Sequence, residues 1–117
     1  MKYFNYFEFD SPDVQGSGQL MDKEVLDLVD QVRELYGKPI HITSGYRTEA
    51  HNEKVGGRQG SSHLKGLAID VACTTSADRY RLIELFMLVG FNRIGVADTF
   101  IHVDLDKDKV QNVIWTY

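Results

Sequence analysis

The chain has 117 residues and a formal net charge of −4, and 43% of its residues are hydrophobic. This length fits a single domain, spanning residues 1–117, with an adequate but not large core. The negative charge provides no general basic field, so no nucleic-acid partner is expected. The only cysteine, Cys73, excludes an internal disulfide and is expected to be buried as a small hydrophobic residue.

No apolar run in the sequence approaches the ~20 residues that a membrane-spanning helix requires. The N-terminal segment is aromatic but is interrupted by Asn5 and Glu8, and it lacks the continuous apolar core and cleavage site of a signal peptide. We therefore expect no membrane insertion and no export through a signal peptide. We also expect a monomer.

The first twenty residues are predicted to form an N-terminal arm and loop. Residues 1–10 carry five β-prone aromatics, which favours a short strand or an extended arm over the core. A patch that binds a cell wall is the alternative for these aromatics. Residues 11–18 contain one proline and two glycines, which are typical of turns, and we expect them to form a flexible lip beside the site.

The clearest helix is predicted over residues 22–36. Asp22 can cap its start, and Gly37 and Pro39 end it. Its apolar residues recur at steps of three and four and define one buried stripe: Val25, Leu28, Val29, Val32 and Leu35. A strand over residues 39–43 follows, with His41 facing away from its aliphatic neighbours.

Residues 44–117 continue with alternating short elements. We predict a turn at Gly45, a short helix over 48–55 and a mobile, glycine-rich loop over 57–62. A second long helix begins near Ser76. Its predicted buried side comprises Tyr80, Ile83, Phe86, Met87 and Gly90. Strands are predicted over 67–71, 91–96, 100–105 and 113–117.

These elements predict an α+β fold. Two main helices would pack on one face of a small, largely antiparallel sheet, within a core that spans residues 21–117. The other face of the sheet is then available for chemistry.

Three side chains on that other face predict a metal site. In the segments 67–71 and 101–105, large aliphatic residues occupy every second position, so Asp70 and His102, which lie between them, project from the face opposite the core. His63, on the glycine-bounded connection before the first segment, can fold over the same point. Two imidazoles and one carboxylate suit catalytic zinc, which keeps three protein ligands and one position for water. A lone histidine-aspartate pair is common by chance, but this alternation around both residues is less so.

Several motifs together resemble one family. They are Ser-Gly-Tyr-Arg-Thr at 44–48, His51-Asn52, Val55-Gly56-Gly57, Ser62-His63-Leu64-x-Gly66-x-Ala68-x-Asp70 and Ile101-His102-Val103-Asp104. They resemble the zinc D-Ala-D-Ala carboxypeptidase family, which includes phage endolysins and D-alanyl-D-alanine dipeptidases and shares a core with the hedgehog signalling domain. The resemblance covers residues 21–117. It implies zinc held by His63, Asp70 and His102, and cleavage of peptide bonds in peptidoglycan.

The resemblance also implies substrate-binding residues. Arg47 follows the turn at Gly45, and the family places such an arginine against a substrate carbonyl or carboxylate. A planar guanidinium suits either group because it can contact two oxygens at once. Ser61 and Ser62 are further candidates for hydrogen bonds to substrate.

The general base is where the sequence departs from the family pattern. Dipeptidase and endolysin relatives carry a glutamate three residues before the last histidine, and Thr99 occupies that position here. Asp98 and Asp104 are the nearby acids able to accept a proton from water. We predict that Asp98 is the base, and that Asp104 instead accepts a hydrogen bond that orients a ligand histidine.

The resulting prediction is a zinc peptidase that acts on peptidoglycan stem peptides. The alternatives are a zinc-containing domain that binds cell-wall peptides or a protein partner without cleavage, and a phage structural component. A phage- or bacterium-encoded peptidase without a signal peptide would stay in the cytoplasm until other means release it to the wall. The sequence does not distinguish carboxypeptidase from endopeptidase activity.

Overall fold

The fold is built around one five-stranded sheet. The computed structural model describes all residues, 1–117. The strands lie in the order β1-β2-β4-β3-β5; neighbours are antiparallel except for the parallel pair β3 and β5. Their bounds are Ile42–Ser44 (β1), Ala68–Ala72 (β2), Arg93–Val96 (β3), Phe100–Asp104 (β4) and Val113–Thr116 (β5).

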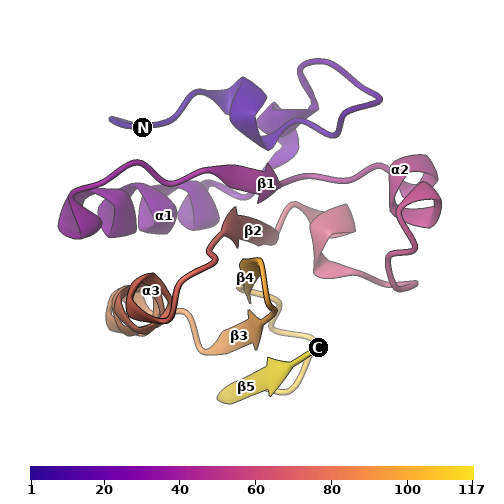
Figure 1. Cartoon of the computed structure of the whole chain (residues 1–117). Coiled ribbons are helices and arrows are strands. Elements are labelled where there is room, and N and C mark those ends of the chain that lie inside the picture. The colour runs from indigo at the N-terminus through magenta and orange to yellow at the C-terminus, as the bar shows by residue number, and fades with distance from the viewer.

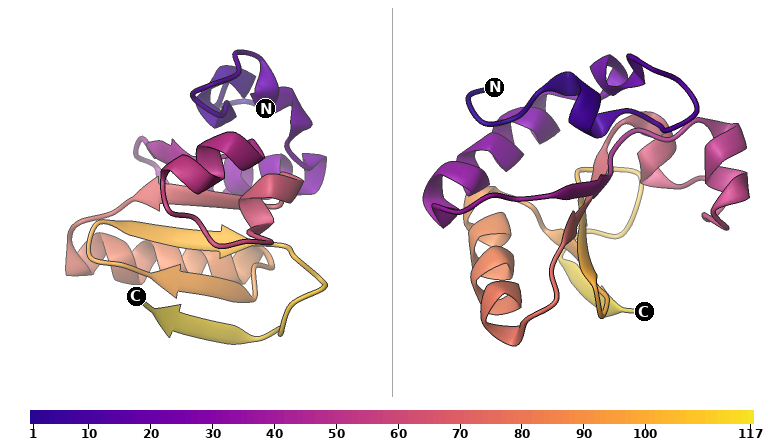
Figure 2. Two further views of the ribbon diagram at one scale, coloured as in Figure 1. Left: turned by 90° about the vertical axis from the view of Figure 1, so that its right-hand side faces the viewer. Right: turned by 45° about the horizontal axis from the view of Figure 1, so that its top comes forward.

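The two long helices cover one face of this sheet. Helix α1 spans Lys23–Tyr36 and helix α3 spans Ser76–Val89. They lie on the same side of the strands, whereas the short helix α2 (Glu49–Lys54) and the 3-10 helix η3 (Ser62–Lys65) lie on the other side (Figures 1 and 2). The predicted α+β fold, with its largely antiparallel sheet and helices on one face, is confirmed. No helix has the length and apolar character needed to span a membrane.

The two central strands separate the core from the opposite face. Ile69 and Val71 of β2 and Ile101 and Val103 of β4 are fully buried in the hydrophobic core. Because side chains alternate along a strand, the intervening residues point to the other face. The predicted alternation of these two segments is therefore confirmed.

Helix α1 begins and ends as its sequence predicts. The Asp22 side chain accepts from the backbone N–H of Val25, and Gly37 ends the helix with φ +75°. Its buried residues include Val25, Val29 and Val32. The predicted stripe is wrong at its last member, because Leu35 is 48% exposed.

The buried side predicted for α3 is correct at Phe86, and Ile83 packs partly against the core, but it is wrong at Tyr80 and Met87. Tyr80 is 73% exposed and Met87 is 55% exposed, whereas Leu82, Leu85 and Phe86 face the core. Apolar side chains occur on every side of this helix, so spacing alone does not select one face. Packing against α1 and the sheet selects it instead.

The N-terminal arm packs on the core as a turn of helix and not as a strand. A 3-10 helix, η1, spans Tyr6–Phe9, and Asn5 and Glu8 cap it reciprocally. Phe4 and Phe9 belong to the core, and Phe9 is fully buried. A second 3-10 helix, η2, spans Ser17–Leu20. Phe4 and Phe9 therefore pack on the core, whereas Tyr6 and Phe7 are exposed.

Gly66 fixes the segment that carries His63. It ends η3 with φ +70°, and a Cβ there would lie 2.4 Å from the backbone oxygen of Leu20. We expect Gly66→Ala to lower the free energy of unfolding by about 2–4 kcal/mol, because left-handed strain and a backbone clash add together. Urea unfolding measures this change through the midpoint at constant m-value.

Gly56 provides the matched control for that substitution. Its φ is +72°, but no atom lies within 4 Å of a Cβ built there. Gly56→Ala should therefore cost only the conformational strain, about 1 kcal/mol. Equal losses in the two variants would contradict the clash with Leu20.

Candidate metal centre and its surroundings

Three buried side chains converge on the face opposite the helices. One ligand atom each from His63, Asp70 and His102 can be chosen so that all lie within 4.8 Å of one another. Asp70 and His102 are direct cross-strand partners in β2 and β4, which places their Cβ atoms about 5 Å apart. The sheet register alone therefore brings two of the three residues together.

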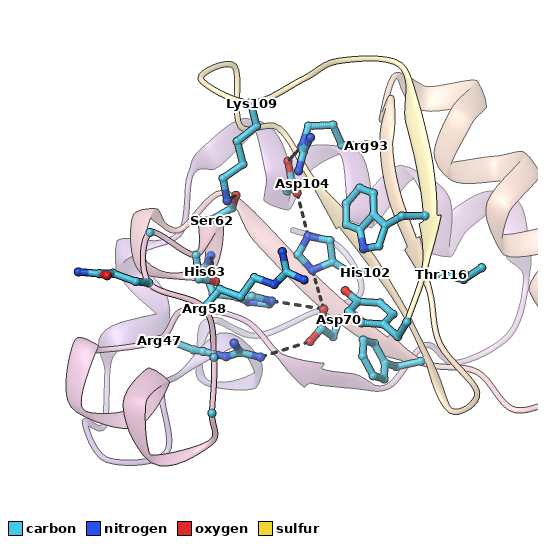
Figure 3. Close-up of a pocket in the computed structure, with 18 residues that line it drawn as sticks. Arg47, Arg58, Ser62, His63, Asp70, Arg93, His102, Asp104, Lys109 and Thr116 are labelled. Atoms are coloured by element: carbon cyan, nitrogen blue, oxygen red, sulfur yellow. Dashed lines mark hydrogen bonds and ion pairs between the residues drawn. The ribbon is translucent and has the colours of Figure 1, made fainter.

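His63 reaches the same point from η3. The Ser61 side chain accepts from the backbone N–H of His63 and caps this short helix. Nδ1 of His63 lies 2.7 Å from the carbonyl oxygen of Gly45, so Nδ1 donates and Nε2 is left as an acceptor. Nε2 points to Asp70 Oδ1 at 3.3 Å (Figure 3).

His102 is held in the same manner from its other ring nitrogen. Its Nε2 lies 2.8 Å from Asp104 Oδ2, and its Nδ1 lies 2.9 Å from Asp70 Oδ1. If Nε2 donates to Asp104, Nδ1 carries a lone pair toward the Asp70 carboxylate. Figure 3 shows His102 between the two carboxylates.

This arrangement fits a metal ion. Two nitrogen lone pairs, from His63 Nε2 and His102 Nδ1, face one carboxylate oxygen, and acceptors that face one another need a proton or a cation between them. The partners at Gly45 and Asp104 are those that typically orient ligand histidines. The three residues form a group able to hold a metal ion.

The charges within the cluster stabilise one another. Burial tends to raise the pKa of Asp70, but hydrogen bonds with His102 and His63 outweigh it and hold this pKa well below its usual range. Burial tends to lower the pKa of His102, but its hydrogen bonds with Asp104 and Asp70 raise it overall. A cation at this position would therefore meet an ionised Asp70.

Arg47 lies beside the cluster, from the segment that follows β1. Its Nη2 is 3.5 Å from Asp70 Oδ2. Its Nε donates to Ser44 Oγ at 3.0 Å and its Nη1 to Asn52 Oδ1 at 3.2 Å. The backbone N–H of Arg47 also donates to the carbonyl of His63. The Ser-Gly-Tyr-Arg motif is thus joined to the metal cluster through both backbone and side chain.

The comparisons with known proteins agree with this geometry. The family model for peptidase M15 matches residues 2–104. The chain belongs to the peptidase M15 family. This confirms the resemblance to zinc D-Ala-D-Ala carboxypeptidases that the motifs indicated. No curated protein matches the chain.

Residues 105–117 lie beyond the part of this M15 peptidase that the family model matches. They nevertheless contribute to the cavity over the metal cluster, which has a volume of about 940 Å³. Lys109, Trp115 and Tyr117 line it, together with Arg58 from the glycine-rich loop. Figure 3 shows the Arg58 side chain extending across the cluster. Sequence reasoning did not identify these four residues as part of the site.

Asp104 is fully engaged by its neighbours. Oδ2 faces His102, whereas Oδ1 accepts from Arg93 Nε at 2.7 Å and from the backbone N–H of Asp106 at 3.0 Å. Only 1% of the residue is exposed. This geometry matches the predicted orienting role. Arg93 was missed in the sequence, although its alternation with Gly95 places it on the same face of the sheet as His102.

Asp98 does not lie in the cavity. It is exposed in the tight turn between β3 and β4, where Ala97 N–H donates to the Phe100 carbonyl. It lines a separate surface groove with Arg79, and Thr99 lies beside it. It lies four positions before His102 and beyond the start of β4 at Phe100. The geometry therefore does not support Asp98 as the general base.

Ser61 and Ser62 both line the cavity, but only one of the two hydroxyl groups can still donate a hydrogen bond to a substrate. The Ser62 hydroxyl donates to Asp106 Oδ2 at 2.7 Å and accepts from Lys109 Nζ at 2.9 Å. A hydroxyl has one hydrogen, so Ser62 has none left for a substrate. Ser61 accepts from His63 N–H and keeps its own hydrogen, so it stays the better candidate for a substrate contact.

Asp104→Asn and Asp98→Asn test the two acids against each other. An amide at position 104 can no longer accept at both oxygens, so we expect zinc affinity to fall by roughly 10- to 100-fold. Asp98→Asn should leave zinc affinity and turnover within twofold or so of wild type, since surface substitutions are usually near neutral. Zinc titration against a competing chelator and steady-state kinetics measure both effects. Loss of turnover in Asp98→Asn would restore the base predicted from the sequence.

Proposed function

We propose that this chain is a zinc metallopeptidase that hydrolyses peptide bonds in peptidoglycan stem peptides, as a D-Ala-D-Ala carboxypeptidase or endopeptidase. The observation that carries the proposal is the cross-strand pair of Asp70 and His102, completed by His63. Membership of a peptidase family supports the reaction type. The substrate class is proposed from the motif resemblance.

The donor set supports zinc as the metal. Two imidazole nitrogens and one carboxylate oxygen, without a thiolate, are typical of catalytic zinc sites. His63, Asp70 and His102 would hold the ion. When bound, zinc polarises a carbonyl and lowers the pKa of water toward ~7, which provides a nucleophile near neutral pH.

The residues around the cluster have separate tasks in this proposal. Arg47, held by Ser44 and Asn52, presents its guanidinium toward the cavity and stabilises negative charge on a substrate carbonyl or terminal carboxylate. Asp104 keeps the tautomer and orientation of His102. Ser61, which lines the cavity, supplies a hydroxyl hydrogen to the substrate.

One observation favours a second candidate function. The only acidic side chains that line the cavity belong to Asp70 and Asp104, and both are engaged by histidines. A hydrolase needs a group that accepts a proton from water. A domain of the same fold that binds cell-wall peptides or a protein partner through its zinc site, without cleavage, needs no such group.

Incubation with purified muropeptides separates the two functions. The zinc-loaded protein should release alanine or shorter peptides that mass spectrometry identifies, and the products also show which bond is cut. A chelator should abolish release, and added zinc should restore it. Retention of intact muropeptides on the zinc-loaded protein, without any product, would support the binding domain and contradict the peptidase. A phage- or bacterium-encoded protein that acts alone on the wall fits either outcome.

A further inference from the structure

The indole of Trp115 lies beside the metal cluster although its strand is two positions away. Trp115 belongs to β5, and β3 separates this strand from His102 in β4. Strands are about 4.8 Å apart, so their backbones are separated by about 10 Å. The ring centroids of Trp115 and His102 are nevertheless only 5.5 Å apart.

Gly95 allows the indole to cross the intervening strand. Gly95 is the direct partner of both His102 and Trp115. A Cβ at position 95 would lie 2.7 Å from Nε1 of Trp115, closer than side-chain carbons normally approach. The absence of a side chain at Gly95 therefore lets the indole of Trp115 lie directly over the backbone of β3. Arg93 adds to it, with its guanidinium carbon 5.0 Å from the centre of the indole ring.

The indole and Arg47 lie on opposite sides of the cluster. Arg47 follows β1 and contacts Asp70 on β2, whereas Trp115 reaches His102 from β5. A peptide whose scissile bond lies at the cluster therefore crosses the strands, with one end toward a guanidinium and the other toward an aromatic wall. Phe100 and Tyr117 extend this wall, with ring centroids 5.2 Å apart.

We propose that Trp115 is a specificity-determining residue, whose indole packs against a small apolar side chain on the amino side of the scissile bond. The inference rests on the proposed peptidase function and deepens it. The carboxyl side of the bond belongs to Arg47, whose fork suits a terminal carboxylate. An indole face offers a large apolar surface against which a small apolar side chain can pack. The residue that flanks the scissile bond, and not a sugar, makes this contact because the indole adjoins a ligand histidine.

Two matched peptides test the preference. They end in D-alanyl-D-alanine and glycyl-D-alanine and differ only by the methyl group that would contact the indole. Wild type should favour the alanyl peptide in kcat/KM by about tenfold, the usual effect of one methyl group in an apolar site. Trp115→Thr should reduce the ratio to near one, and Trp115→Phe should retain part of it. An unchanged ratio in Trp115→Thr overturns the inference while the peptidase function stands.

Two further variants separate specificity from folding. Gly95→Ala keeps the tryptophan but displaces its ring, so it should also lower the ratio. Ile114→Thr changes the neighbouring residue of β5, which is 55% exposed, and should keep the wild-type ratio. If Trp115 only supported His102, Trp115→Thr would weaken zinc binding and lower kcat/KM equally for both peptides, which would also overturn the inference.

The indole itself gives a readout that is independent of cleavage, because Trp115 is the only tryptophan. Binding of a D-alanyl-D-alanine peptide with a reduced scissile amide should shift the fluorescence emission of Trp115 to the blue and protect the indole from acrylamide quenching. Binding seen by calorimetry without either change would overturn the inference. If the protein binds this peptide and shows both changes but cleaves nothing, the peptidase function fails and the contact with Trp115 stands. A protein that neither cleaves nor binds either peptide overturns the inference and the carboxypeptidase form of the proposed function, and cleavage of muropeptides at an internal bond would then leave the endopeptidase form standing.

Discussion

His63→Ala and His102→Ala should each lower zinc affinity by more than the ~100-fold that loss of an outer hydrogen bond can cost. The reason is that each substitution removes a direct nitrogen donor from a three-residue group, and two donors do not define a tight site for this ion. Metal analysis of protein purified with limiting zinc, followed by chelator competition, measures the loss. Peptidase activity should fall with zinc occupancy.

His41→Ala is the matched control for these two substitutions. His41 is exposed and lies outside the cavity, so its removal should leave both zinc content and activity unchanged. Full zinc occupancy in both His63→Ala and His102→Ala would contradict the ligand assignment. A loss of zinc in all three variants would indicate an effect on folding, which circular dichroism detects.

The group of His63, Asp70 and His102 could be predicted from the sequence because two of these residues are placed by the regular alternation of side chains along strands. In strands β2 and β4, alternate residues face opposite sides, so aliphatic residues at 69, 71, 101 and 103 decide where Asp70 and His102 point. Once two such strands pair in register, the ligands meet. The start and end of α1 were predictable for a similar reason, because Asp22 and Gly37 act on their own backbone neighbours.

The surroundings of the cluster depend on packing between distant segments, which the sequence does not display. The buried side of α3 was predicted only in part, because apolar side chains occur on every side of that helix and only the elements packed against it select a face. Asp98 is close to His102 in sequence, but the turn between β3 and β4 directs it away from the cavity. Trp115 is thirteen residues from His102 and yet adjoins it, because β5 pairs with β3 and Gly95 leaves space for the ring.

Arg47→Lys should preserve the fold and the zinc site but reduce kcat/KM by roughly 100-fold or more, as the loss of a well-placed donor to a developing negative charge does. The guanidinium uses three different nitrogens at once, toward Ser44, Asn52 and Asp70. A lysine ammonium keeps the charge, but it is a compact donor on a flexible stem and cannot reproduce that planar set of contacts. Steady-state kinetics on a muropeptide substrate, with zinc content measured on the same samples, gives the result.

Arg81→Lys is the matched control, because it makes the same substitution at a surface position outside the cavity. Arg81 lies on the exposed side of α3 and pairs only with Glu84, so the same substitution there should leave kinetics unchanged. If Arg47→Lys is as active as Arg81→Lys, the guanidinium does not act on the substrate, and its role is limited to the ion pair with Asp70 seen without a bound metal. If kcat/KM falls while zinc content stays at the wild-type level, the guanidinium acts on the substrate, because the three metal ligands are then intact.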